Sequence, residues 1–130
     1  MTILEARDIE FRKNGKTIID VDAFHLYEGE VTALIGVNGA GKTTLMQILA
    51  LLQQPTAGKV FFKGEQAQKN NLLRLRKKMA FVFQQPLLLD MTVRKNIETG
   101  LRLRGVSPQE IKNRVEEWLE KLGISHLAEG

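Results

Sequence analysis

The sequence contains no cysteine, one tryptophan, one tyrosine and three prolines in 130 residues. Without cysteine the chain can form neither a disulfide framework nor a thiolate metal site, which fits a reducing, intracellular compartment. No stretch approaches the roughly 18 consecutive apolar residues that a membrane span needs. Charges recur every few residues at the beginning of the chain, which argues against a signal peptide. We therefore expect a soluble chain that forms one domain, or part of one.

Positive charge is concentrated in the middle of the chain. Residues 66–105 carry nine Lys or Arg against two Asp or Glu, although the formal net charge of the whole chain is only +4. Such a segment can be a nucleic-acid or lipid-headgroup surface, or a solvated helix face. No aromatic residues are interleaved to stack on bases, so the solvated face is favoured and we expect no nucleic-acid partner.

Residue patterns predict alternating strands and helices. Residues 3–11 and 17–27 read as a β-hairpin around the Asn14-Gly15 turn, and the Pro- and Gly-containing segment 53–58 reads as a loop. Short apolar runs predict buried strands at 31–36 and 79–84, and a further strand is expected at 58–64. Helices are expected at 43–53, buried all round, and at 68–79, with Leu72, Leu73 and Leu75 near one side.

The last two helices have the clearest boundaries. Residues 93–105 place Val93, Ile97 and Leu101 at helical spacing after a start at Thr92. Residues 107–123 begin with Ser107 as N-cap, followed by Pro108 and by Glu110, which completes a capping box. The apolar stripe of this helix is Ile111, Val115, Trp118, Leu119 and Leu122.

The segment GVNGAGKTT, residues 36–44, follows an apolar run and opens a helix. Gly36, Gly41, Lys42 and Thr43 satisfy the pattern G-x-x-x-x-G-K-[ST], in which backbone N–H groups and a helix N-terminus cradle phosphates. Lys42 is predicted to reach the β- and γ-phosphates, Thr43 to bind Mg²⁺, and Thr44 to donate to a phosphate. A Gly-rich packing turn and a dinucleotide fingerprint are the alternatives, and the spacing fits the second poorly. A nucleoside triphosphate with Mg²⁺ is the expected ligand.

Three spaced segments resemble one family, the nucleotide-binding domains of ATP-binding cassette (ABC) transporters. They are NGAGKTTL at 38–45, LQQPTAGKVFFKG at 52–64 and FVFQQPLLLDMTVRKNI at 81–97. The resemblance implies an α/β fold with a P-loop NTPase (RecA-like) core, an N-terminal antiparallel β-subdomain and the start of an α-helical subdomain. It divides the chain into residues 1–85, 86–92 and 93–130. The implied ATP contacts in the loop are Gly36, Asn38, Gly39, Ala40, Gly41, Lys42, Thr43 and Thr44.

The resemblance also assigns two residues outside this loop. Phe11 matches the aromatic residue that stacks on adenine, and Gln84 matches the Q-loop glutamine, a ligand of Mg²⁺ or water that senses the γ-phosphate. Lys42 and Gln84 are thus the implied catalytic residues, and Thr43 and Gln84 the implied metal ligands. The alternatives are an ordinary core phenylalanine at position 11 and an edge polar residue at position 84. His25 and His126 are expected to be structural or exposed.

The implied partners are a transmembrane permease subunit and a second nucleotide-binding subunit, on the cytoplasmic face of the membrane. The permease is expected to contact residues 85–91, which begin at Gln85 and contain the apolar residues Leu87, Leu88, Leu89 and Met91. The alternative is a loop that folds its leucines onto its own domain. The separate-subunit arrangement resembles bacterial importers, and residues 86–105 faintly resemble those for inorganic oxyanions such as tungstate.

The other motifs of the family do not occur in these residues. No run of four apolar residues followed by Asp-Glu comes after the P-loop, and LSGGQ and a downstream switch histidine are also absent. We therefore expect a fragment of the domain that binds Mg-ATP weakly and does not hydrolyse it alone. The alternatives are another P-loop enzyme, such as a kinase or GTPase, and a non-enzymatic module that binds partners.

Overall fold

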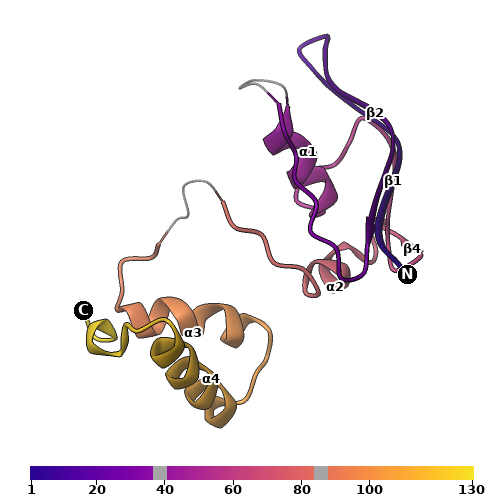
Figure 1. Ribbon diagram of the computed structural model, residues 1–130. Coiled ribbons are helices and arrows are strands. Elements are labelled where there is room, and N and C mark those ends of the chain that lie inside the picture. The colour runs from indigo at the N-terminus through magenta and orange to yellow at the C-terminus, as the bar shows by residue number, and fades with distance from the viewer. Residues whose placement is uncertain (37–40, 84–87) are drawn as a thin grey trace. The chain divides into compact units, whose positions relative to one another are not determined.

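A computed structural model describes residues 1–36, 41–83 and 88–130. The chain divides into two compact units, Met1–Phe81 and Val82–Gly130, and Figure 1 shows them as a β-rich and a helical part. Each unit has its own hydrophobic core.

The first unit is built on the predicted hairpin. β1 (Thr2–Lys13) pairs antiparallel with β2 (Lys16–Tyr27) across the Asn14-Gly15 turn. β3 (Ala57–Phe62) pairs with the other edge of β1, and the short β4 (Glu65–Gln66) completes a sheet of order β2-β1-β3-β4. The hairpin and the third strand confirm the predictions from alternation and turn residues.

The pairing of β1 is irregular at three places, two toward β2 and one toward β3. The first, toward β2, lies between Thr2 and Leu4. The register of β1 with β3 shifts between Arg7 and Glu10, where Asp8 adopts a positive φ of 52°. Its register with β2 shifts between Phe11 and Arg12. Such bulges twist a strand and re-aim its side chains.

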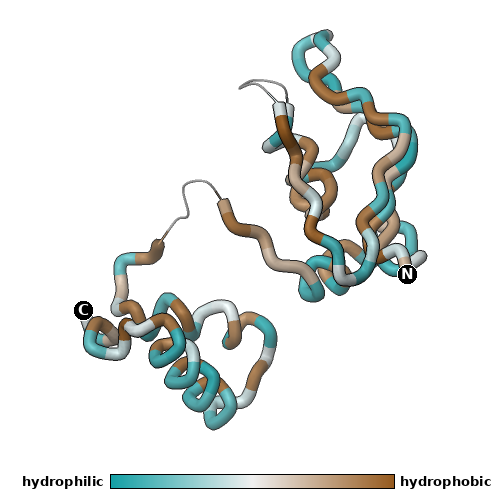
Figure 2. The backbone as a smooth tube through the Cα atoms, viewed as in Figure 1, coloured by the Kyte–Doolittle hydropathy of each residue, from teal (hydrophilic) through white to brown (hydrophobic). Residues whose placement is uncertain are grey.

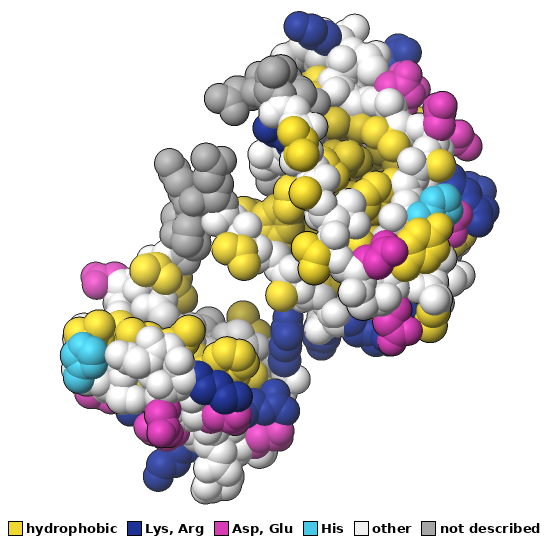
Figure 3. Space-filling view, in the orientation of Figure 1, with side chains coloured by type: hydrophobic (Ala, Val, Ile, Leu, Met, Phe, Trp, Pro, Cys, Tyr) yellow, Lys and Arg dark blue, Asp and Glu magenta, His cyan; other side chains and the backbone are white. Residues whose placement is uncertain are grey.

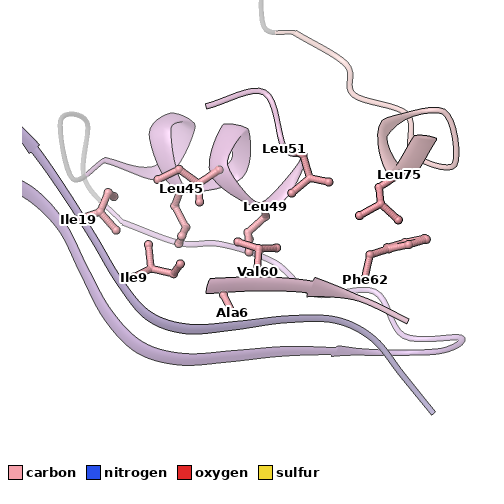
Figure 4. Close-up of a cluster of buried hydrophobic side chains, with 10 residues drawn as sticks. Ala6, Ile9, Ile19, Leu45, Leu49, Leu51, Val60, Phe62 and Leu75 are labelled. Carbon is pink, nitrogen blue, oxygen red and sulfur yellow. The ribbon is translucent and has the colours of Figure 1, made fainter. Parts of the chain in front are cut away.

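Two helices pack on this sheet. α1 (Lys42–Leu49) buries Leu45, Ile48 and Leu49, and α2 (Leu72–Arg76) buries Leu75. Figure 4 shows Ile9, Ile19 and Val60 projecting from the strands toward Leu45 and Leu49 of α1. The buried core of this unit consists of Ala6, Ile9, Ile19, Leu45, Ile48, Leu49, Leu51, Val60, Phe62 and Leu75.

Both predicted helices of this unit form where the sequence placed them, but their bounds and their buried residues differ from the prediction. α1 ends at Leu49 rather than near residue 53, and it is not buried all round because Met46 is 47% exposed. Leu51, with a positive φ of 63°, stops it early. In α2 the side chain of Leu73 is 65% exposed, so Leu72 and Leu75 alone face the core.

The two predicted parallel strands do not form in the described residues. Residues 31–36 and 79–83 have no strand assignment, and Val31, Ile35 and Val82 are 100%, 93% and 86% exposed. A continuous apolar run specifies a parallel strand only where both of its faces are covered and neighbouring strands complete its ladder. Exposure of these three side chains means that this cover is missing here, so the prediction of two buried strands was wrong for this structure.

The second unit is an antiparallel helix pair. α3 (Val93–Leu103) and α4 (Pro108–Lys121) are followed by a 3₁₀ turn, η1 (Ser125–Leu127). Thr92 and Ser107 cap the two helices as predicted. The Thr92 hydroxyl accepts from the Lys95 N–H, and the Ser107 hydroxyl accepts from the Glu110 N–H. The Glu110 carboxylate contacts Arg114, the next turn along α4.

The core of the second unit is small. Ile111, Val115, Leu119 and Ala128 are buried, and Val93, Ile97, Leu101, Val106 and Ile124 pack against them. Trp118 and Leu122, which the sequence placed in the same stripe, are 52% and 61% exposed. The i, i+4 row Ile111, Val115 and Leu119 is enough to cover α3. The prediction that Trp118 and Leu122 belong to the buried stripe was therefore wrong.

Candidate functional site

The candidate site lies at the beginning of α1, where the Gly-rich segment enters the helix. Gly41 is the N-cap residue and has a left-handed backbone, with φ of 82°. Lys42 and Thr43 are the first helical residues, and the first turn contains no acidic side chain to neutralise the positive end of the helix dipole. The Lys42 ammonium donates to the carbonyl oxygen of Gly36, the first residue of the Gly-rich segment.

Gly41 sits directly on the β2 strand. A Cβ placed on Gly41 would stand 2.6 Å from Cδ1 of Ile19 and 3.1 Å from the carbonyl oxygen of Ile18. The left-handed backbone favours glycine at this position, and a side chain there would also force Ile19 Cδ1 to shift. This contact fixes the N-terminus of α1 against the hairpin.

Phe11 lies close to the same junction. It is directly opposite Ile19 in the β1–β2 ladder, and directly opposite residues point to the same face of a sheet. Ile19 in turn contacts the position of Gly41. Phe11 is half-buried and packs against the edge of the core, so part of the ring supports the hairpin and part remains accessible.

Several predicted site residues lie outside the described residues. Asn38, Gly39, Ala40 and Gln84 belong to this group, as does Gln85 at the start of the predicted permease contact. Of the others, Thr43 is exposed and Lys42 and Thr44 are half-buried. The structure thus brings together Phe11, Gly36, Gly41, Lys42, Thr43 and Thr44 within one unit.

The described part of the predicted permease contact is apolar and exposed. Leu88, Leu89 and Met91 are 79%, 52% and 42% exposed, and Figure 2 shows hydrophobic residues on both sides of the grey trace at 84–87. The two leucine side chains are more than half exposed, so they do not fold onto their own domain, which was the alternative from sequence. The Met91 sulfur, in contrast, lies 3.9 Å from the Thr99 hydroxyl of α3.

Asn96 of α3 holds the backbone of this loop. Its side-chain oxygen accepts from the Leu89 N–H at 2.9 Å. Its side-chain nitrogen lies 3.1 Å from each of the carbonyl oxygens of Leu89, Met91 and Thr92. One amide side chain thereby satisfies both polar groups of Leu89 and fixes the segment that enters α3.

An apolar hollow of the first unit is a separate feature. It has a volume of about 410 Å³ and is lined by apolar residues of β1, β2, α1 and the segments at 32–34 and 79–81. Figure 3 shows hydrophobic side chains gathered in this hollow. None of the predicted site residues lines it, so size alone does not locate the chemistry.

The outer face of the sheet carries an ion-pair cluster. The Arg7 side chain donates to the Glu5 carboxylate at 2.6 Å, and His25 lies 3.4 Å from the same carboxylate and stacks on Tyr27. The hydrogen bond from Arg7 is the main reason that the pKa of Glu5 is lowered. His25 and His126 are both exposed, as the sequence suggested.

Sequence reasoning assigned no role to Thr56, which the structure joins to both sides of Phe11. The Thr56 N–H donates to the Glu10 carbonyl at 2.8 Å, and the Thr56 hydroxyl accepts from the Arg12 N–H at 2.9 Å. The quartet PTAG at 55–58 was interpreted as a loop and as part of the resembling segment 52–64, and neither interpretation indicates a contact with β1.

Comparison with known proteins identifies the class. Residues 19–130 match the family model described as ABC transporter, so the chain belongs to the ABC transporter family. It is 34% identical over 130 residues to the putative HMP/thiamine import ATP-binding protein YkoD of Bacillus subtilis (strain 168), covering 98% of this chain and 23% of that protein.

Two solved structures share the fold. One is cbiO1 from Clostridium perfringens, described as part of the ABC transporter complex cbiONQ, with a TM-score of 0.82 and 28% identity. The other is the ATP-binding cassette MJ0796, a dimer bound to ADP and Pi, with a TM-score of 0.85 and 25% identity. This chain spans 53% and 60% of those two chains. The expected fold class is confirmed.

Two searches of the described residues were negative. Within residues 1–36, 41–83 and 88–130, no helix is both long and apolar enough to cross a membrane. The same ranges contain no group of three or more His, Cys, Asp or Glu side chains placed to hold a metal ion.

Proposed function

We propose that this chain is the nucleotide-binding half of an ATP-hydrolysing subunit of an ABC transporter. In this proposal the phosphates of ATP lie over the N-terminus of α1, with Lys42 on the β- and γ-phosphates. Thr44 donates to a neighbouring phosphate, and Phe11 stacks on adenine. Gly36, Asn38, Gly39, Ala40 and Gly41 supply the backbone around the phosphates.

The observation that carries the proposal is the contact between Lys42 and the Gly36 carbonyl. Lys42 is the first residue of α1, and its ammonium reaches back across the loop to the point where the loop begins. It therefore stands beside the N-terminus of α1, the end of a helix to which an anion is drawn. A phosphate bound there replaces the weak carbonyl partner of Lys42 with a charge-assisted one.

The residues present fit magnesium as well as phosphate. Thr43 is exposed on the first turn of α1, so its hydroxyl is accessible to an ion bound beside the phosphates. Thr43 and Gln84 would hold the ion through oxygen atoms, which Mg²⁺ prefers. Bound magnesium would neutralise part of the triphosphate charge, and the task of the protein residues is to bind and orient the nucleotide.

Hydrolysis is expected to need a carboxylate that the assigned positions do not supply. The positions assigned here bind and orient a triphosphate, but none of them is a carboxylate placed to position an attacking water. We therefore infer that the 130 residues bind Mg-ATP weakly and turn it over slowly or not at all.

The test is a titration of the chain with Mg-ATP, followed by the NMR signal of the Gly41 amide. Lys42→Ala is expected to weaken binding at least about tenfold, because one charge-assisted contact contributes about 1.5–3 kcal/mol. Lys59→Ala, an exposed lysine on β3, is the matched control and should leave affinity unchanged. Equal affinities for all three proteins would refute the proposed phosphate site.

The exposed apolar loop at 88–91 supports a contact with a transmembrane permease subunit. Its exposure also favours a second candidate function, a non-enzymatic module that binds a partner without using nucleotide. Lys42→Ala separates the two: a nucleotide-gated subunit loses partner affinity together with ATP affinity, whereas a simple docking module keeps it. We place the complex at the cytoplasmic face of the membrane, with a second nucleotide-binding subunit as its dimer partner.

The solute is chosen by other subunits in this proposal. Import is the expected direction, and the faint resemblance of residues 86–105 to importers of inorganic oxyanions such as tungstate stays a prediction. So do the division of the chain at residues 85 and 92 and the γ-phosphate-sensing role of Gln84.

A further inference from the structure

We propose that Thr56 is a positioning residue for adenine recognition, because it clamps the β1 backbone on both sides of Phe11. This inference rests on the proposed nucleotide site and adds a residue to it. Thr56 would not touch the nucleotide. It would set the direction in which the Phe11 ring faces the adenine base.

The clamp consists of two hydrogen bonds. The Thr56 N–H donates to the carbonyl oxygen of Glu10 at 2.8 Å, and the Thr56 hydroxyl accepts from the N–H of Arg12 at 2.9 Å. Glu10 and Arg12 are the two neighbours of Phe11 in β1. Both peptide units that flank the aromatic residue are therefore held by one threonine.

The clamp occupies the point where the β1–β2 ladder is interrupted. Phe11 pairs with Ile19, but Arg12 pairs with Thr17, so the register shifts immediately after Phe11. A register shift of this kind bends the strand and increases its local twist. It also changes the direction of nearby side chains. The hydroxyl of Thr56 holds the Arg12 N–H at this irregular step.

The residues after Thr56 anchor the clamp to the same strand. Ala57 pairs with Glu10 in the β1–β3 ladder. A Cβ on Gly58, which has a φ of 102°, would come within 2.7 Å of the Arg7 carbonyl oxygen. Residues 56–58 therefore follow β1 closely from Arg12 back to Arg7, and Thr56 is held in place rather than swinging free.

Loss of the Thr56 clamp should affect binding of the adenine base and not binding of the phosphates. Lys42 and Thr43 belong to α1, which begins at Gly41 and makes its own contact with β2 through Ile19. Loosening β1 at Arg12 would change the pose of Phe11 without moving α1. The affinity for adenine nucleotides should fall, and the affinity for the bare phosphate chain should not.

The test compares Mg-ATP with Mg-tripolyphosphate on the whole chain, again by titration followed at the Gly41 amide. Thr56→Val keeps the shape and the backbone N–H of threonine but removes the hydroxyl acceptor. We expect it to weaken Mg-ATP binding about fivefold, the effect of one net hydrogen bond, and to leave Mg-tripolyphosphate binding unchanged. Thr56→Ser retains the hydroxyl and should restore the wild-type ratio. Thr17→Val, an exposed threonine on the facing strand, is the control.

A double-mutant cycle identifies Phe11 as the residue through which Thr56 acts. Phe11→Leu should lower the preference for ATP over tripolyphosphate. The double variant Phe11→Leu/Thr56→Val should show the same preference as Phe11→Leu alone. Equal weakening of both ligands by Thr56→Val would mean a purely structural role and would overturn the inference. So would an unchanged ratio, or additive losses in the double mutant. If the wild-type chain bound neither ligand, the proposed function itself would fail and the inference with it.

Discussion

Ile19 occupies the space that a side chain at Gly41 would need. Its Cδ1 lies 2.6 Å from where a Cβ on Gly41 would stand. Gly41→Ala is therefore expected to lower the free energy of unfolding of the first unit by about 2–4 kcal/mol, from overpacking together with left-handed backbone strain. Amide hydrogen exchange at the buried residues Ile9 and Ile48 measures this loss.

Two variants separate the contact from the backbone strain. Gly15→Ala also imposes a positive φ, 73°, but a Cβ there meets nothing within 4 Å, so it should cost only about 1–2 kcal/mol. Ile19→Val removes Cδ1 and should partly rescue Gly41→Ala. If Gly41→Ala and Gly15→Ala cost the same, the contact with Ile19 is not what requires glycine at position 41.

Gly58 is a second position where backbone lies against backbone. A Cβ at Gly58 would stand 2.7 Å from the Arg7 carbonyl oxygen and closer still to the Asp8 carbonyl oxygen. Neither atom can rotate away as a flexible side chain can. Gly58→Ala should therefore cost about 2–4 kcal/mol and increase amide exchange in β1 and β3. Gly64→Ala, with φ of 81° and open space around it, is the control and should cost less.

Local patterns in the sequence predicted local structure well. The Asn14-Gly15 hairpin, the Thr92 and Ser107 caps and the β3 strand all depend on residues within a few positions of one another. The P-loop pattern likewise identified the N-terminus of α1, because glycine, lysine and threonine act there through their immediate neighbours. The assignment to the ABC transporter family followed from such short segments.

Features that depend on distant residues were predicted poorly. Residues 31–36 have the composition of a buried parallel strand, yet Val31 is fully exposed, because a parallel strand also requires neighbours that supply its ladder and cover. Trp118 and Leu122 have helical spacing, but α3 covers only the row from Ile111 to Leu119. The clamp of Thr56 on β1 joins residues 44 positions apart, so no local pattern could reveal it.

The stability of the first unit should depend on pH through Glu65. Its carboxylate accepts from Arg74 and, at 3.0 Å, from Asn71, and the Arg74 bond is the main cause that lowers its pKa below the ordinary value of 4.5. A lowered carboxylate pKa gives stability that is present above 4.5 and is lost as the pH falls through the folded-state value.

The free energy of unfolding should therefore stay level near neutral pH and decline below about pH 4.5. Glu65→Gln should make that decline shallower without removing it, because the pKa of Glu5 is lowered too, chiefly by Arg7. Urea unfolding at a series of pH values measures the slope. Glu28→Gln, at an exposed glutamate beyond β2, should leave the slope as in the wild type. An identical slope in Glu65→Gln would mean that the Arg74 pair does not form in solution.

Asn96 is expected to determine the shape of the exposed loop at 88–91. Asn96→Asp keeps an acceptor for the Leu89 N–H but directs a carboxylate at the carbonyl oxygens of Leu89, Met91 and Thr92, which repel it. Loss of these donor bonds should speed amide exchange at Leu89 about tenfold or more, since each unsatisfied polar group costs about 1–3 kcal/mol. Asn113→Asp, on the exposed face of α4, is the matched control.

The same experiment distinguishes loop disorder from unfolding of the helices. Exchange at Val115 and Leu119, which are buried in the second unit, should be unchanged in Asn96→Asp because their core contacts do not involve the loop. If exchange at these two residues rose as much as at Leu89, Asn96 would be supporting the helix pair as a whole. A selective change at Leu89 would mean that the exposed leucines are presented on a backbone held in one shape. Pre-ordering of that kind lowers the entropy lost when a partner binds them.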